Sequence, residues 1–525
     1  MIGLAEFPVS TLLQSFAARQ GISRHSLPQT RINSEGAAKD LPKLQTLLHP
    51  TGIKTHPSEA AKAVTCLITD SRRVVPGALF FAISGQKSNG NHYLEEAIDR
   101  GAVAIVSEQE AGLRCPIPHY KVDDVRLTLA QVAKVFYSCP DEALKTTAIT
   151  GTNGKSTVAI LTQHLLGGRD QVGLLGTIRY DLGKRTLPSF RTTPESVDIF
   201  AMLDQMRRGS CKFAVLEASS HGLEQKRIYG MRCEVAAYLN LTRDHLDYHE
   251  TMEDYFAAKA RLFNGDNGSV PAHAVINRED PHAAKLIALI GNESKVTTFG
   301  FSDGADIYAG AISLTARETA FDLHCGEVTY RIRTDLPGRY NILNLLAAFA
   351  IARAHGLDEA LIIKRLQTVP QVPGRMERIT NPHGFQVFVD YAHTDDALSQ
   401  ALAMLRDITP GRLIAVFGCG GNRDRGKRPR MAAAADKAAD MLYITSDNPR
   451  SEAIDNIFKD IRTGLISPEA AHFISDRREA IASAIASARP GDTILIAGKG
   501  HETYQEFADS VTPFDDRQVA RECLA

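Results

Sequence analysis

The sequence predicts a multidomain α/β protein, and three observations carry that prediction. The chain has 525 residues, more than a single hydrophobic core usually holds, so roughly three or four domains are expected. Strand-like and helix-like patterns alternate through its last third, which predicts a parallel sheet covered on both faces. A glycine-rich loop, residues 151–157, directly follows an apolar strand-like segment.

Bulk composition excludes several classes of protein. With 44% hydrophobic and 23% charged residues, the chain resembles an ordinary soluble globular protein. Its 60 basic and 61 acidic residues nearly balance, which predicts neither a nucleic-acid partner nor insertion into a membrane. The 8 cysteines are scattered without C-x-x-C spacing, as expected for free thiols of a reducing cytosol. We therefore expect a cytoplasmic protein.

The amino-terminal quarter divides into two parts. Residues 1–60 are polar and contain proline, and we expect a weakly structured extension there. An organellar transit peptide is the alternative, because residues 20–45 are poor in acids and contain Ser and Arg. Residues 61–140 form the first domain. Its expected strands are 78–83 and 102–106, and its expected helices are 93–100 and 127–137.

The central domain is expected over residues 141–373. Its apolar strands are each followed by a polar loop, and two prolines and a glycine at 370–374 mark a hinge. The last domain, 374–525, alternates strands with segments of helical spacing. Ligands of such sheets bind beyond the carboxyl ends of strands, so polar residues that directly follow a strand are the strongest candidates for ligand contacts. The expected strands are 146–150, 213–216 and 235–239 in the central domain, and 385–390, 413–417, 441–445, 471–474 and 493–497 in the last.

The glycine-rich loop has the features of a phosphate-binding loop. Glycines let successive backbone N–H groups point at anionic oxygens, and the helix that follows adds its positive dipole. Lys155 supplies a cation for the outer phosphates, and Ser156 can bind Mg²⁺. The strict pattern G-x-x-x-x-G-K-[ST] is not met, because Ile149 stands where the first glycine belongs. The alternative is a plain glycine turn between a strand and a helix. The expected ATP-binding residues here are Gly151, Thr152, Asn153, Gly154, Lys155, Ser156 and Thr157.

Further motifs follow in a fixed order along the chain. With the loop they resemble the Mur ligases and the related folylpolyglutamate synthetases. The resemblance implies a three-domain Mur ligase architecture, with a UDP-sugar-binding domain, a central P-loop ATPase-like domain and a C-terminal Rossmann-like domain that binds an amino acid. The motifs that carry it lie at 217–223, 240–249, 255–259, 340–344, 374–377, 390–393, 418–429, 447–450 and 498–502.

The last three motifs are similar to those of family members that add meso-2,6-diaminopimelate to UDP-N-acetylmuramoyl-L-alanyl-D-glutamate in peptidoglycan precursor synthesis. The resemblance implies that ATP activates the D-Glu side-chain carboxylate as an acyl phosphate. The amine of diaminopimelate then attacks through a tetrahedral intermediate. Two Mg²⁺ ions are implied as cofactors, and we expect a monomer.

The resemblance also implies a catalytic set of Lys155, Glu217, His221 and Lys259. Ser156 and Glu217 would hold the nucleotide metal, and His221 the second one. Lys259 would be carbamylated by CO₂, giving an anionic oxygen donor for that second Mg²⁺; this requires a neutral amine, which burial favours. The alternatives are a helix N-cap or buried salt bridge for Glu217, and a surface lysine covering apolar side chains for Lys259.

Other substrate contacts are carried over from the family motifs. Asn341, Arg375 and Asp390 would contact adenine, phosphate and ribose respectively. Asp395 stands where the family usually has proline. The short amino-terminal motifs could instead be ordinary turns. The implied UDP-sugar-peptide contacts are Ser71, Gln86, Lys87 and Ser88 in the first domain, and Thr192, Thr193, Ser219, Gln225 and Arg227 in the central one.

Arg450 carries the inference on the amino-acid substrate. Meso-diaminopimelate has a distal carboxylate that L-lysine lacks, and a planar guanidinium suits that group. An Arg450 left unpaired beside lysine would be costly, which predicts rejection as well as binding. The alternative for residues 447–450 is a turn ahead of a helix. The full implied set is Arg423, Asp447, Asn448, Pro449, Arg450, Gly498 and Glu502.

Four other functions are the alternatives. A folylpolyglutamate synthetase shares the central loop but lacks the UDP-sugar domain and the Asp-Asn-Pro-Arg motif. A sibling Mur ligase differs only in substrate. A P-loop motor or regulatory GTPase needs switch machinery or a basic nucleic-acid surface, and neither is evident. An inactive binding module is disfavoured because a residue of the expected type occupies each family role named above.

Overall fold

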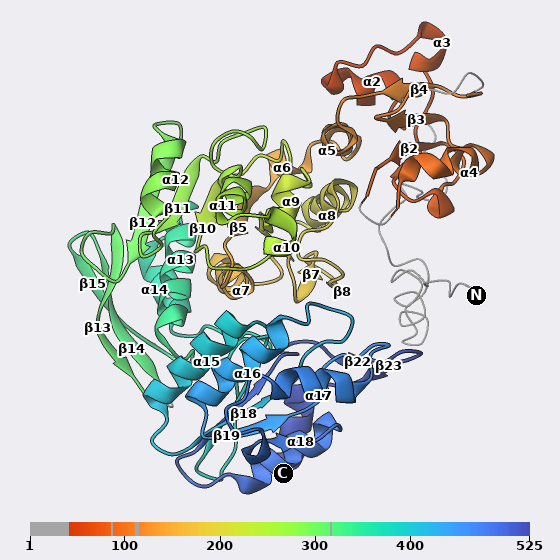
Figure 1. The fold of residues 1–525 in the computed structure, drawn as a ribbon. Coiled ribbons are helices and arrows are strands. Elements are labelled where there is room, and N and C mark those ends of the chain that lie inside the picture. The colour runs from red at the N-terminus through yellow and green to blue at the C-terminus, as the bar shows by residue number, and fades with distance from the viewer. Residues whose placement is uncertain (1–40, 86–87, 111–114, 316–317) are drawn as a thin grey trace, which may run out of the picture. The chain divides into compact units, whose positions relative to one another are not determined.

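The computed structural model describes residues 41–85, 88–110, 115–315 and 318–525 (Figure 1). Contacts within the chain divide it into two units. The first runs up to Thr298 and includes Ala350–Leu357; the second comprises Phe299–Phe349 and Asp358–Ala525. In the described part of the chain, no helix combines the length and the apolar character needed to cross a membrane.

Residues 41–60 are structured, which corrects the prediction that the whole of 1–60 is weakly structured. Leu44, Leu47 and Leu48 lie on one face of a single helical turn and are fully buried in the core of the first unit. A helix of one turn is too short to give a recognisable period, so the sequence pattern did not reveal it. The elements here are α2 (Leu44–Leu48), η2 (His49–Thr51) and α3 (Pro57–Ala60).

A parallel four-stranded sheet in the order β1-β2-β3-β4 follows. Strands β2 and β3 are buried along their length, as the apolar runs predicted. Asp124 caps α5 by accepting a 2.8 Å hydrogen bond from Leu127 N. The elements are β1 (Cys66–Ile68), η3 (Ser71–Arg73), β2 (Ala78–Ala82), η4 (Gly90–Tyr93), α4 (Leu94–Asp99), β3 (Ala104–Ser107), β4 (His119–Lys121), α5 (Val125–Phe136) and α6 (Pro140–Ala143).

The central sheet of the first unit has the order β12-β11-β10-β5-β9-β6-β7-β8. Strands β5, β6, β9, β10 and β11 are parallel, and β7 and β8 are antiparallel additions at one edge. The strands are β5 (Lys145–Thr150), β6 (Val172–Leu175), β7 (Arg179–Asp181), β8 (Thr186–Pro188), β9 (Phe213–Glu217), β10 (Val235–Tyr238), β11 (His273–Asn277) and β12 (Lys295–Gly300). The helices are α7 (Lys155–Leu166), α8 (Ser196–Arg208), α9 (Ser220–Glu224), α10 (Leu246–His249), α11 (Met252–Ala260) and α12 (Ala283–Ile290).

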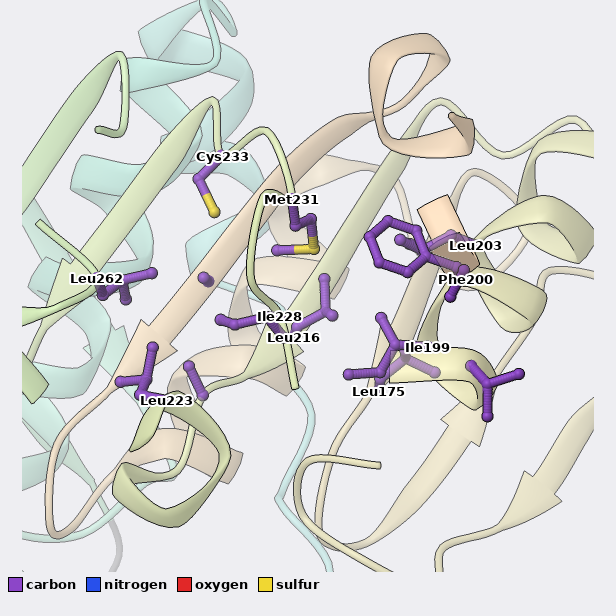
Figure 2. Packing of buried hydrophobic residues seen from close by; sticks show 14 of the residues in the cluster. Leu175, Ile199, Phe200, Leu203, Leu216, Leu223, Ile228, Met231, Cys233 and Leu262 are labelled. Carbon is purple, nitrogen blue, oxygen red and sulfur yellow. The ribbon is translucent and has the colours of Figure 1, made fainter. Parts of the chain in front are cut away.

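The core of this unit lies between the sheet and its helices (Figure 2). Ile199, Phe200 and Leu203 of α8 face Leu175 of β6 and Leu216 of β9, and all five are buried. Burying a side chain of this size stabilises the fold by about 1.5–3 kcal/mol. In the strand register, the carboxyl ends of β9, β5 and β10 are neighbours, so the loops that follow these strands meet at one edge of the sheet.

The second unit begins with an antiparallel set, β13 (Ile307–Leu314), β14 (Thr319–Cys325) and β15 (Val328–Thr334). The helices that follow are α13 (Arg339–Ala354) and α14 (Glu359–Leu366). The end of α13, from Ala350 on, is assigned to the first unit. These elements have no counterpart among the predicted ones. The sequence of β15, Val-Thr-Tyr-Arg-Ile-Arg-Thr, alternates apolar and polar residues as a half-buried strand does, so this strand could have been recognised from the pattern.

The carboxyl-terminal sheet has the order β16-β17-β21-β18-β19-β20 and is parallel except for the edge strand β16. The predicted alternation of strands and helices is confirmed. The strands are β16 (Glu377–Ile379), β17 (Gln386–Asp390), β18 (Leu413–Phe417), β19 (Met441–Ile444), β20 (His472–Phe473) and β21 (Thr493–Ala497), with a separate hairpin of β22 (Tyr504–Glu506) and β23 (Val511–Pro513). The helices are α15 (Asp395–Ile408), α16 (Lys427–Ala438), α17 (Ile454–Arg462), η5 (Pro468–Ala470), α18 (Arg477–Ser487) and α19 (Asp516–Leu524).

Candidate active site

The glycine-rich loop joins β5 to α7 as the sequence predicted. Gly154 has a φ of 87°, in the left-handed region that favours glycine, and Lys155 begins the helix. The loop therefore presents backbone N–H groups and the positive end of a twelve-residue helix to the same space. Lys155 Nζ donates to Gly151 O at 2.7 Å and to Thr152 O at 2.8 Å.

Asn240, at the carboxyl end of the neighbouring strand β10, holds this loop in shape. Its Oδ1 accepts from Asn153 N at 2.8 Å, and its Nδ2 donates to Asn153 O at 3.1 Å. Thr152 N also donates to Asn240 O at 3.0 Å, and Thr242 N donates to Thr152 Oγ1 at 3.1 Å. Asn240 begins the motif of residues 240–249 but is not among the predicted site residues.

Three oxygen-bearing side chains meet beside the loop. Glu217, at the end of β9, is 2% exposed, and its Oε2 accepts from Ser156 Oγ and Thr177 Oγ1, both at 2.9 Å. Thr177 N donates to Glu217 Oε1 at 2.9 Å. Thr177 follows β6, so its position after a strand was the signal that could have revealed it.

These donors fit Mg²⁺. A hydroxyl and a carboxylate oxygen are the ligands it prefers, and it usually keeps waters and phosphate oxygens for its other positions. Within residues 41–525, apart from the undescribed gaps, no three His, Cys, Asp or Glu side chains are grouped as a complete protein-made metal site. Ser156 and Glu217 could hold Mg²⁺ together with phosphate oxygens of a nucleotide.

Lys259 lies in the last turn of α11 and is 1% exposed, which excludes the surface-lysine alternative. Its Nζ lies 4.2 Å from the centre of the Tyr255 ring. Burial, reinforced by Lys155, holds the pKa of this ammonium well below its ordinary value, and attraction to Asp244 and Asp280 offsets only part of that effect. This shift favours the neutral amine, which is the form that carbamylation requires.

His221 lies on α9 within a group of aromatic rings. Its ring centre is 4.0 Å from that of Tyr248, 4.9 Å from that of His245 and 5.3 Å from that of His249. His249 is buried and also stacks on Tyr255, whose ring lies under Lys259. The predicted residues His221 and Lys259 are therefore linked by one aromatic cluster.

The five predicted substrate residues of the central domain lie together. Thr193 Oγ1 donates to Glu217 O at 2.7 Å and lies 3.0 Å from Ser219 Oγ. Arg227 Nη1 donates to Thr193 O at 2.7 Å, and its Nη2 donates to Gln225 Oε1 at 2.6 Å. Thr192 Oγ1 is 3.0 Å from Thr177 Oγ1, which joins this group to the residues around Glu217.

Glu195 is a charged residue of this region that sequence reasoning missed. Arg191, Arg126 and Arg227 contact its carboxylate at 2.6, 3.1 and 3.4 Å. Burial would raise the pKa of Glu195, but the three arginines together hold it below its usual value. With three cations around one anion, the cluster keeps a net positive charge beside Thr193, which suits an anionic substrate group.

The predicted residues of the amino-terminal domain are only partly described. Ser71 is buried and donates to Glu96 Oε2 at 2.7 Å. Ser88 is exposed, and its backbone oxygen accepts from Gly85 N at 2.9 Å. Gln86 and Lys87 lie outside the described residues.

Asn341, Arg375 and Asp390 belong to the second unit. Asn341 is 2% exposed and donates to Pro337 O at 2.8 Å. Asp390 accepts from Met376 N at 2.7 Å and from Ala392 N at 2.8 Å. Burial raises the pKa of Asp390, and Arg375 opposes that shift. The Arg375 guanidinium therefore lies close enough to act on the Asp390 carboxyl.

The predicted amino-acid contacts converge beyond β19 and β21. Asn448 Nδ2 donates to Glu502 Oε2 at 3.1 Å, and the fully buried Lys499 donates to Asn448 Oδ1 at 3.0 Å and to Glu502 Oε2 at 3.1 Å. Gly498 has a φ of 113°, which favours glycine, and a Cβ there would lie 2.6 Å from Asp447 Oδ2, so a larger residue would force the Asp447 side chain to move. Burial and Asp447 raise the pKa of Glu502, while Lys499 lowers it.

Arg450 is paired within the protein. Its Nε donates to Glu506 Oε2 at 2.8 Å, and its Nη1 donates to Gly421 O at 2.9 Å. This changes the expected cost of lysine binding, because the guanidinium would not be left without partners when the distal carboxylate is missing. Arg423, also predicted here, is exposed, with its Cγ 3.7 Å from the position of a Cβ on Gly420.

Comparison with known proteins agrees with this arrangement. The Mur ligase family catalytic domain matches residues 63–137, the Mur ligase middle domain 149–352, and the Mur ligase glutamate ligase domain 374–500. The chain is 42% identical over 470 residues to the UDP-N-acetylmuramoyl-L-alanyl-D-glutamate–2,6-diaminopimelate ligase of Solibacter usitatus, covering 89% of this chain and 95% of that protein. The ligase of the same name from Geobacillus thermodenitrificans is 41% identical over 486 residues, covering 91% and 98%.

Solved structures give the same result. A structure of a UDP-N-acetylmuramoyl-L-alanyl-D-glutamate–2,6-diaminopimelate ligase has a TM-score of 0.68 and 35% identity, covering 92% of this chain and 99% of that one. A Mycobacterium tuberculosis folylpolyglutamate synthase complexed with ADP has a TM-score of 0.56 at 18% identity, covering 71% and 92%. The second likeness is one of fold alone.

Proposed function

The chain belongs to the Mur ligase family of ATP-dependent, amide-bond-forming ligases, and we propose that it adds meso-2,6-diaminopimelate to UDP-N-acetylmuramoyl-L-alanyl-D-glutamate. The observation that carries the choice of amino acid is the turn of residues 447–450. It brings Asp447, Asn448 and Arg450 to the carboxyl edge of the last sheet, where Asn448 is hydrogen-bonded to Glu502. A cationic group next to acidic ones complements the carboxylate and ammonium at the distal end of diaminopimelate.

The energy of the reaction comes from ATP at the loop 151–157. Forming an acyl phosphate brings a carboxylate against a triphosphate, so the repulsion between anions must be offset. The loop N–H groups and the amino terminus of α7 bind phosphate oxygens, and Lys155 turns from its own loop carbonyls to the outer phosphates. Asn341, Arg375 and Asp390 bind the adenine, phosphate and ribose parts.

Mg²⁺ would be held by Ser156 and Glu217, with His221 and carbamylated Lys259 providing for a second ion. When bound, it neutralises phosphate charge as the acyl phosphate forms. Lys259 is suited to carbamylation because burial lowers the pKa of its ammonium and so favours the neutral amine that attacks CO₂. Thr177 keeps the Glu217 carboxylate in one orientation through two hydrogen bonds.

The UDP-sugar peptide binds at the cluster around Thr193. Arg227 is oriented by Thr193 O and Gln225, and its remaining N–H groups suit a carboxylate or pyrophosphate oxygen pair. Thr192 and Ser219 offer hydroxyls beside it. Ser71, Gln86, Lys87 and Ser88 bind the uridine-diphosphate end. The amine of diaminopimelate then attacks the acyl phosphate, and phosphate leaves as the tetrahedral intermediate collapses.

The reaction takes place in the cytoplasm and needs only one copy of the chain. All 8 cysteines are free thiols in the structure, which agrees with a reducing compartment.

One assay tests the proposal. ADP release is measured with ATP, Mg²⁺ and UDP-N-acetylmuramoyl-L-alanyl-D-glutamate, adding either meso-diaminopimelate or L-lysine. The expected result is ADP release that requires the UDP-precursor and diaminopimelate together, with L-lysine used at least tenfold less efficiently. Equal use of both amino acids, or release without the UDP-precursor, would refute the assignment.

A further inference from the structure

The hairpin of β22 and β23 is hydrogen-bonded to the turn of residues 447–450, which is the proposed amino-acid-binding turn. Arg450 N donates to Glu506 O at 3.0 Å, and Glu506 N donates to Asn448 Oδ1 at 3.0 Å. The neighbouring Gln505 donates from Nε2 to Asp447 O at 2.9 Å. Strand β22 thus bonds to three of the four residues of the turn, although it lies more than fifty positions further along the chain.

The backbone of Arg450 needs this support. Its φ is 53°, in the left-handed region that non-glycine residues rarely adopt. Such conformations persist where the surrounding contacts outweigh their cost, and the bond to Glu506 O is one of those contacts. The same residue therefore fixes the backbone of Arg450 and, through its carboxylate, the side chain.

Two of the three nitrogens of the Arg450 guanidinium are hydrogen-bonded within the protein. Nε is bonded to Glu506 Oε2 and Nη1 to Gly421 O, and the arginine and glutamate side chains are 23% and 26% exposed. Among the described residues, Nη2 has no hydrogen-bond acceptor, so one end of the guanidinium remains available to a carboxylate. A long arginine side chain that must be ordered on binding loses affinity through conformational entropy, and ordering it beforehand avoids that loss.

We propose that Glu506 is a positioning residue that presents Arg450 to the distal carboxylate of the amino-acid substrate. The inference rests on the proposed function, and it adds a residue to which neither the sequence motifs nor the comparisons assign a role. Glu506 acts through Arg450 and does not itself touch the substrate carboxylate, which it would repel.

Removing the Glu506 side chain has two opposite effects on KM for diaminopimelate. It frees the Arg450 guanidinium, which raises KM. It also removes a negative charge near the substrate carboxylate, which lowers KM. Both side chains are partly exposed, so solvent screens the longer-range repulsion, whereas the 2.8 Å charge-assisted contact is short. Positioning therefore outweighs repulsion, and KM is expected to rise.

The test compares Glu506→Ala and Glu506→Gln with the wild type in the ADP-release assay. Glu506→Ala is expected to raise KM for meso-diaminopimelate about tenfold with kcat changed less than about threefold. Glu506→Gln keeps an oxygen that can accept from Arg450 Nε, so its KM should lie between the other two. The matched control is Asp509→Asn, an exposed acid in the same hairpin, which should behave as wild type. KM values for ATP and the UDP-precursor should not change in any variant.

The outcomes separate the two proposals. A wild type that releases no ADP with diaminopimelate overturns the proposed function and the assignment of Glu506 with it. A wild type that uses diaminopimelate, with an unchanged or lower KM in Glu506→Ala, overturns the assignment alone. An equal rise in all three KM values also overturns it, because it would show a general structural defect.

Discussion

Replacing Lys259 with methionine gives a direct test of the reasoning about burial. The side chain is 1% exposed on α11 and packs against the Tyr255 ring. Methionine has a similar length and no charge, so it can occupy the same space without a cavity. In the absence of CO₂, Mg²⁺ and nucleotide, Lys259→Met is expected to make the protein more stable at pH 7.5, while ligase activity is lost.

The magnitude follows from proton linkage. An unfolded lysine has an ordinary pKa of about 10.4, whereas burial holds the pKa of folded Lys259 well below that value. Between the two pKa values the unfolded chain binds more protons, so the stability of the wild type rises with pH. The destabilisation caused by Lys259 is fully present below the folded pKa and disappears as pH rises through the unfolded one. It falls by up to about 1.4 kcal/mol for each pH unit in that window.

Thermal unfolding at pH 7.5 and pH 9.5 measures the effect. At pH 7.5 the variant should melt about 2 °C or more above the wild type, and the difference should shrink at pH 9.5. Lys364→Met, at an exposed position on α14, is the control and should show no pH-dependent difference. A stability gain that stays constant between the two pH values, or a loss at both, would refute the interpretation of Lys259 as a buried neutral amine.

Two further substitutions test the metal and amino-acid sites. Thr177→Val removes the 2.9 Å hydrogen bond from the Thr177 hydroxyl to Glu217 Oε2 but keeps the bond from the Thr177 backbone N–H. We expect kcat/KM to fall about tenfold and the half-maximal rate to need more Mg²⁺, because the carboxylate is less firmly oriented. A titration of rate against Mg²⁺ checks this, and an unchanged titration curve would contradict it. Gly421→Ala would place a Cβ 1.9 Å from Pro449 O, so the turn of residues 447–450 must shift. KM for diaminopimelate should then rise at least about tenfold, while KM for ATP stays constant. A normal KM for diaminopimelate would show that the close approach of Gly421 to Pro449 does not shape the site.

Much of the fold was predictable from local pattern. The strands β17, β18, β19 and β21 lie within one residue of their expected ends, because buried parallel strands are short apolar runs between turn residues. The edge strand β20 is only two residues long, shorter than the expected 471–474. Edge strands are paired on one side, so the pattern says less about where they end.

Some residues of the candidate sites were predictable from local pattern, and others were not. Lys155, Ser156 and Asp447 could be found because each follows a strand of a parallel sheet. Thr177 also follows a strand, which was the available signal, whereas Glu506 could not be found, since it matters through Arg450, 56 positions away, which the fold brings beside it.

The sequence by itself determined the phosphate loop after β5, the Asp-Asn-Pro-Arg turn and the order of the motifs that mark the family. These features depend on glycine conformation, turn chemistry and the periods of strand and helix, all of which act between near neighbours in the chain. Only the tertiary structure decided that Lys259 is buried and that Arg450 is already paired with Glu506. Burial and ion pairing depend on which distant elements cover a side chain, and those same elements set its pKa and its remaining hydrogen-bonding capacity.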